Sequence, residues 1–184
     1  MPSITVALVL ANVLAYRLEL ASGGQSFCEA FGLVPAHFVR TGEIAPIFTA
    51  MFLHANLTHL VGNLVFLAIF GAVAENALGR VRFTVLYFAS GVGGALLHVV
   101  VDPSATNAMV GCSGCLFGLI ALVAALKPRF LGFALALGGI EIWHSLSGGE
   151  TSVSFGAHLG GLAVGALFAG LFRVTGFSEE ERFA

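Results

Sequence analysis

Residues 111–127 have the sequence GCSGCLFGLIALVAALK, an apolar stretch bounded by Gly111 and Lys127. Only 15 residues lie between these two, and as a helix they cover about 22 Å. The hydrocarbon core of a bilayer is about 30 Å thick. The polar segment before the stretch, residues 103–107, is therefore expected to dip below the membrane surface. Irregular backbone at that depth must be buried in protein or line a water-filled cavity, which places Ser113 on the floor of such a cavity.

The composition of the whole chain supports a membrane setting. Of its 184 residues, 58% are hydrophobic and 10% are charged, whereas a soluble domain has about 25% charged residues. The sequence predicts an all-α polytopic membrane protein, a single domain over 1–184, with a short fourth span and a long membrane-associated first loop over about 19–56. The six predicted transmembrane helices cover roughly residues 3–18, 57–75, 83–101, 112–126, 130–146 and 154–172.

Basic residues predict the orientation. With six spans, both termini lie on the same side as the break between the second and third spans and the break between the fourth and fifth spans. That side carries six of the eight basic residues, Arg80, Arg82, Lys127, Arg129, Arg173 and Arg182, and the other side carries Arg17 and Arg40. Both termini are therefore predicted to be cytoplasmic. The first stretch lacks the basic leader region of a signal peptide, so a transmembrane helix is favoured there.

Four polar side chains from three predicted spans share one depth. His59 and Asn63 lie in the first turns of the second span, Ser113 opens the fourth, and His158 lies one turn into the sixth. All four are within roughly 10 Å of the outer helix ends. Glycines in the fourth and sixth spans would let those two helices approach closely. Polar residues inside spans mark function by default, so this set is the candidate site.

The chemistry expected of these residues is that of a serine hydrolase. Ser113 is the candidate nucleophile and His158 the general base that takes its proton. His59 and Asn63, at positions i and i+4, could stabilise a tetrahedral oxyanion. No aspartate shares this depth, which predicts a dyad, with Phe117 one turn below Ser113 able to hold the imidazole by stacking.

Other chemistries are disfavoured. Cys112 and Cys115 form a C-x-x-C, but they lie in an apolar segment without a second pair, so packing is preferred to a metal or redox site. No metal or other cofactor is expected. A net charge of -2 and the absence of a basic patch predict no nucleic-acid partner.

Four motifs, taken in order, resemble the rhomboid family in its compact six-span prokaryotic form. His54-x4-His59-x3-Asn63 is similar to the family's second-span motif, and Gly71-x3-Glu75-x3-Gly79 follows it. The Gly111-Cys112-Ser113-Gly114 segment matches the nucleophile motif, and Ala157-His158-x-Gly160-Gly161 matches that of the base. The resemblance covers nearly the whole chain.

The resemblance implies an intramembrane serine endopeptidase. It implies a Ser113–His158 dyad, with His59 and Asn63 around the oxyanion. The implied partners are the lipid bilayer and single-span membrane proteins, cut in or near their transmembrane segment with small residues preferred. It also implies substrate entry past the fifth span, a flexible cap before the sixth, and a site near the outer face of a bacterial or archaeal plasma membrane.

The chain departs from the family pattern at two places. Cys112 stands where the family most often has alanine, and the Trp-Arg pair of the first loop in some members is absent. The second departure concerns the anchoring of the 19–56 loop rather than the chemistry.

Several residues keep two interpretations. His54 either supports the site or only braces the loop, and Glu75 is expected to cap a helix or to pair with Arg80 or Arg82. Glu141 and His144 could line the cavity or face lipid headgroups. An inactive rhomboid-like protein that binds membrane clients is the main alternative function, although such proteins lack the serine or the histidine. A proton-relay transporter is disfavoured because the spans are largely apolar below their outer third.

Overall fold

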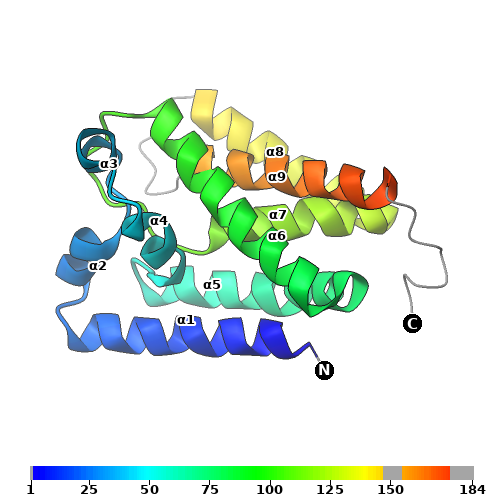
Figure 1. The fold of residues 1–184 in the computed structure, drawn as a ribbon, viewed down its shortest axis with the longest axis horizontal. Helices are drawn as coiled ribbons and strands as arrows, with labels where there is room; N and C mark the ends of the chain where they lie inside the picture. The colour runs from blue at the N-terminus through cyan, green and yellow to red at the C-terminus, as the bar shows by residue number, and fades with distance from the viewer. Residues whose placement is uncertain (1, 147–154, 175–184) are drawn as a thin grey trace.

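The computed structural model describes residues 2–146 and 155–174, and these residues form a bundle of helices (Figure 1). The described part contains no strand, apart from an isolated bridge between Leu33 and Met109. The predicted all-α architecture is confirmed. The α-helices are α1 (Ser3–Ala21), α2 (Gln25–Phe31), α3 (Pro35–Thr41), α4 (Ala45–Thr49), α5 (Leu57–Phe66), α6 (Ala72–Val101), α7 (Ser113–Leu126), α8 (Leu131–Leu146) and α9 (Phe155–Val174).

The chain from α5 to α6 covers residues 57–75 and 83–101, for which two spans are predicted. A π-helical turn, η2 (Leu67–Gly71), joins α5 to α6, and the chain then turns at Gly79, which has φ 74° and ψ 166°. Figure 1 shows α5 lying beside α1 and the remainder of α6 crossing back over the bundle. The break predicted over residues 79–82 is thus confined to one glycine, because a backbone with positive φ suits glycine best.

In the described part of the chain, three helical stretches are long and apolar enough to cross a membrane: Ser3–Ala21, Leu57–Val101 and Phe155–Phe172. The second has 45 residues and includes the turn at Gly79. By contrast α7 has 14 residues, about 21 Å of helix, which confirms the short helix expected in the middle of the fold. The short apolar stretch Pro128–Ile140 begins with a 3-10 turn, η3 (Pro128–Phe130), and continues into α8. The number of spans stays a prediction.

Helix α7 is the core of the bundle. Its side chains are buried almost all the way round, and Cys115, Leu119, Leu122 and Val123 have no exposed surface. A helix that is apolar on every side is stable only when other elements surround it. Helices α6 and α9 pack against α7 and against each other.

Glycines bring α7 and α9 into backbone contact. A Cβ atom added at Gly161 would collide with the carbonyl of Gly114, and one at Gly165 with the carbonyl of Gly118. Spacing of small residues by four is the pattern that lets membrane helices pack this closely. We refer to Gly114, Gly118, Gly161 and Gly165 as the glycine seam.

The segment between α1 and α5 is more structured than a simple loop. It contains α2, α3, α4 and the 3-10 turn η1 (Ala50–Phe52), which lie at one end of the bundle (Figure 1). Leu33 and Met109 exchange two backbone hydrogen bonds of 3.0 and 2.8 Å, so the segment is tied to the chain just before α7. Its association with the membrane stays a prediction. The cap expected before the sixth span falls on residues 147–154, outside the described residues.

Glu75 caps a helix, one of the two roles expected of it. Its carboxylate accepts hydrogen bonds from the backbone N–H groups of Ile4 and Thr5, at 3.0 and 2.7 Å, and from the Thr5 hydroxyl at 2.8 Å. The first N–H groups of a helix have no partner within the helix, and a carboxylate there also complements the helix dipole. Glu75 therefore joins α6 to the beginning of α1.

Candidate active site

Ser113 and His158 meet at the top of the glycine seam. Ser113 is the first residue of α7, and His158 lies in the first turn of α9. Ser113 Oγ is 2.8 Å from His158 Nε2, although the two residues are 45 positions apart in sequence. With a neutral imidazole, the hydroxyl donates to Nε2, which is the contact that a serine nucleophile and its general base require.

The His158 ring is stacked on Phe117. The two ring centroids are 4.2 Å apart and the planes differ by 10°. Phe117 follows Ser113 by one turn of α7, so the helix that carries the hydroxyl also carries the aromatic surface behind the imidazole. The stacking considered from the sequence is present, and it restricts rotation of the ring.

His59 and Asn63 of α5 reach the backbone just before Ser113. A Cβ atom at Gly111 would lie 2.7 Å from His59 Cε1 and 3.4 Å from Asn63 Nδ2. Gly111 also has φ +118°, a conformation that disfavours any side chain. A glycine is therefore needed here both for the turn and for the space that the two polar side chains occupy.

Asn63 has an unused hydrogen-bond donor. It is 8% exposed, and its Nδ2 has no hydrogen-bond partner among the described residues. A buried donor without a partner is costly unless a ligand or water completes it. The side chain faces a cavity, so its donor is available to a bound molecule.

The cavity has a volume of about 1100 Å³, and Ser113, His158, His59, Asn63 and Phe117 all line it. The remaining wall includes residues 105–111, parts of α2 and α5, the end of α6, and Leu137 of α8. The sequence predicted a cavity at Ser113, and the structure has one. The four candidate site residues thus share one cavity with other polar residues of its wall.

His54 lies behind this cavity and does not line it. Its side chain is fully buried, its ring meets that of His59 edge-on at 5.1 Å, and its Nε2 is 4.0 Å from Cys112 Sγ. Burial lowers the pKa of His54 to about 4, so the ring is neutral at neutral pH. Its backbone N–H donates to Glu19 Oε2 at 3.1 Å.

Glu19 is a buried acid that is not among the residues predicted from the sequence. It is 2% exposed in the last turn of α1, beyond the predicted end of the first span at residue 18. Its one sequence signal is a carboxylate adjoining an apolar stretch, which is common and does not mark a site. The side chains of Glu141 and His144 lie outside the described ones, so their two interpretations stay open.

The cysteines are buried free thiols. Cys112 and Cys115 have no exposed surface, and the space above Gly91 is filled by Cys115 Sγ. Within the described residues, no three His, Cys, Asp or Glu side chains are grouped closely enough to hold a metal ion. The geometry agrees with the packing role expected for the C-x-x-C.

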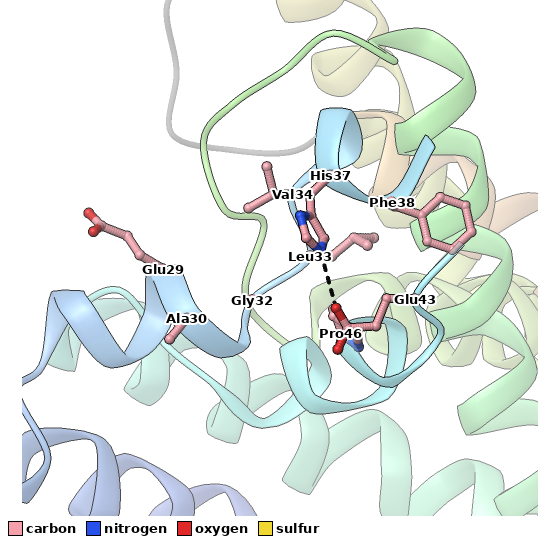
Figure 2. Close-up of a pocket in the computed structure, with 9 residues that line it drawn as sticks. All are labelled: Glu29, Ala30, Gly32, Leu33, Val34, His37, Phe38, Glu43 and Pro46. Carbon is pink, nitrogen blue, oxygen red and sulfur yellow. Dashed lines mark hydrogen bonds and ion pairs between the residues drawn. The ribbon is translucent and has the colours of Figure 1, made fainter. Parts of the chain in front are cut away.

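A second, smaller cavity of about 260 Å³ lies among α2, α3 and α4 (Figure 2). His37 points across it toward Glu43, with 3.1 Å between Nε2 and Oε2. Both side chains are largely exposed, and an exposed pair of this kind contributes little to stability. None of the predicted site residues lines this cavity.

Comparison with known proteins gives a family match. Residues 41–174 match the model of the rhomboid domain. The chain is 33% identical over 143 residues to "RHOMBOID-like protein 1" of Arabidopsis thaliana, covering 74% of this chain and 36% of that protein. It is 29% identical over 180 residues to "Rhomboid protease GluP" of Bacillus subtilis, covering 91% and 34%.

A third relative is "Rhomboid-like protease 3" of Toxoplasma gondii, 36% identical over 131 residues, which are 65% of this chain and 48% of that protein. The matches thus cover less than half the length of each of these relatives. The match to the rhomboid domain extends from the last residue of α3 to the last residue of α9 and includes all four residues of the candidate site. This chain, an integral membrane protein with long apolar helices, belongs to the rhomboid family.

Proposed function

We propose that this protein is an intramembrane serine endopeptidase in which Ser113 is the nucleophile and His158 is the general base. The observation that carries the proposal is the 2.8 Å contact between Ser113 Oγ and His158 Nε2. Two relatives are named rhomboid proteases or rhomboid-like proteases, which favours the same activity.

The proposed reaction is acyl transfer to serine followed by hydrolysis. Ser113 Oγ attacks the scissile carbonyl while His158 takes its proton, and the imidazolium then protonates the leaving amine. Water, activated by the same histidine, releases the acyl group from Ser113. Stacking on Phe117 keeps the imidazole plane fixed during both proton transfers.

Asn63 and His59 are proposed to stabilise the oxyanion. Both side chains lie against Gly111, two residues before the nucleophile, and Asn63 Nδ2 is a donor without a partner among the described residues. One preorganised donor of this kind typically contributes about 2.7–4 kcal/mol to transition-state stabilisation.

The proposed substrates are single-span membrane proteins cleaved in or near their transmembrane segment. The nucleophile lies in a cavity of about 1100 Å³ within a bundle of apolar helices, which suits an extended peptide entering from the bilayer. We place both termini in the cytoplasm, because the side of the membrane that holds them also holds six of the eight basic residues. The site then lies near the outer face of a bacterial or archaeal plasma membrane.

Cleavage of a single-span reporter in liposomes tests the proposal. Wild type is expected to cleave, whereas Ser113→Ala and His158→Ala should lose at least about 1000-fold of the rate. Ser104→Ala is the matched control, since the Ser104 hydroxyl donates to Asp102 Oδ1 and Ser104 does not line the cavity. Cleavage by Ser113→Ala at the wild-type rate would refute the assignment, and a wild type that binds but does not cleave would favour a client-binding protein.

The orientation has its own test. A reporter that is active only outside the cytoplasm, fused after Ala184, should be silent. Activity of that fusion would contradict the placement of the termini.

A further inference from the structure

Glu19 is a buried carboxylate that the mechanism above does not use. It is 2% exposed, in the last turn of α1. Moving a carboxylate out of water is expensive unless hydrogen bonds compensate it. The compensation comes from the backbone N–H of His54, which donates to Oε2 at 3.1 Å across 35 residues of sequence.

His54 connects Glu19 to both sides of the candidate site. Its ring meets the His59 ring edge-on, with 5.1 Å between centroids, and its Nε2 is 4.0 Å from the Sγ of Cys112. Cys112 immediately precedes Ser113. A shift of the His54 backbone would therefore be transmitted to a proposed oxyanion residue and to the turn that presents the nucleophile.

Residues at the beginning of the first loop also contact Glu19. The backbone carbonyl of Glu19 accepts hydrogen bonds from Ser22 and Gly24 at 3.1 and 2.8 Å, which closes the end of α1. Its carboxylate lies beside the Cys28 thiol of α2, whose pKa is raised to about 12 by burial and then by the negative charge of Glu19. The thiol therefore stays protonated, and the carboxylate has a second neighbour that can donate to it.

We propose that Glu19 is a positioning residue, which holds the His54 backbone so that the His54 ring keeps His59 in place above Gly111. The proposal rests on the protease function proposed above. It assigns to the end of α1 a role in the geometry of the oxyanion site, although Glu19 itself does not line the cavity.

The kinetic test compares Glu19→Leu with Glu19→Gln. Leucine leaves the His54 N–H without its acceptor, whereas the amide oxygen of glutamine can still accept. Glu19→Leu should lower kcat by about 10- to 100-fold with little change in KM, because misplacement of a catalytic group by about 1 Å can cost this much. Glu19→Gln should stay close to wild type. Glu43→Leu, which changes an exposed acid between α3 and α4, should not alter kcat.

A double-mutant cycle separates positioning from general instability. If Glu19 acts through His59, Glu19→Leu should have little further effect on kcat in a His59→Ala background. A loss that is equally large in both backgrounds would overturn the proposal, as would a Glu19→Gln variant as impaired as Glu19→Leu.

A second measurement does not depend on activity. NMR of 15N-labelled histidine in micelles, assigned by single substitutions, should show the His54 and His59 ring signals shifted in Glu19→Leu and the His37 signal unchanged. Unshifted His54 and His59 signals would overturn the positioning role even if the protein cleaves its substrate. If the His54 and His59 signals shift in Glu19→Leu but the wild-type protein cleaves no substrate, the positioning role is supported and the protease function is refuted.

Discussion

Different kinds of interaction position the two halves of the candidate site, the Ser113–His158 pair and the His59–Asn63 pair. Ser113 and His158 are brought together by backbone contact between α7 and α9 at the glycine seam, where an added methyl group meets a carbonyl. His59 and Asn63 are held by side chains instead: Asn56 caps α5, and Glu19 holds the chain at His54. Steric contact tolerates no added atom, whereas hydrogen bonds can be weakened in steps. The two halves should therefore respond differently to mutation.

Gly161→Ala should have the largest effect. Its Cβ would collide with the Gly114 carbonyl, so α7 and α9 must separate and Ser113 must move away from His158. Overpacking of this kind costs about 1–3 kcal/mol, and the displaced dyad should lose about 100-fold or more in kcat. Reporter cleavage and thermal unfolding in detergent measure both.

Gly170→Ala is the control for that change. It lies on the same helix, but no atom of the described residues is within 4 Å of its added Cβ. It should keep full activity. If Gly161→Ala cleaves the reporter at the wild-type rate, α7 and α9 can separate at the glycine seam without loss of activity. The two halves of the site would then not differ in their response to mutation.

The second prediction probes the boundary between the halves. Gly111→Ala adds a Cβ that would lie 2.7 Å from the His59 ring, at a residue with φ +118°. We expect about a 10- to 100-fold loss of kcat, since His59 must move. Gly42→Ala separates strain from displacement, because Gly42 has φ +69° and no atom of the described part of the chain lies within 4 Å of an added Cβ. Equal losses in the two variants would attribute the effect to backbone strain alone.

The same contrast explains what the sequence could predict. Ser113, His158, His59 and Asn63 stand out because each is a polar residue in an apolar stretch, and helical rise alone assigns them one depth. The close approach of α7 and α9 follows from glycines spaced by four. These are local patterns, and the structure brings the four side chains around one cavity.

Glu19 could not be found in this way. A charged residue at the end of an apolar stretch is usual, and Glu19 is buried only because the chain around residue 54 folds against it. The pairing of Leu33 with Met109 is likewise a contact between segments that are far apart in sequence. Neither follows from periodicity, since each depends on how the first loop packs.

The smallest predicted effect concerns the cap of α5. Asn56 Oδ1 accepts a hydrogen bond of 2.8 Å from the His59 N–H, so Asn56→Ala removes a cap at the turn that carries His59. The expected cost is about 1 kcal/mol of stability and about a threefold loss of kcat. Asn56→Asp keeps an acceptor and should recover both, as measured by thermal unfolding and reporter cleavage.

The size of the effect at Asn56 distinguishes the two halves of the site more finely than the larger effects do. If Asn56→Ala lowers kcat only slightly while Gly161→Ala lowers it strongly, the half of the site that contains His59 and Asn63 can relax around a missing hydrogen bond. An abrupt loss at Asn56, with Asn56→Asp restoring stability but not cleavage, would contradict that view. It would mean that Asn56, which also lines the cavity, contacts the substrate directly. The half of the site that contains His59 and Asn63 would then tolerate substitution as poorly as the glycine seam does. The cause would be a lost contact with the substrate rather than a steric collision.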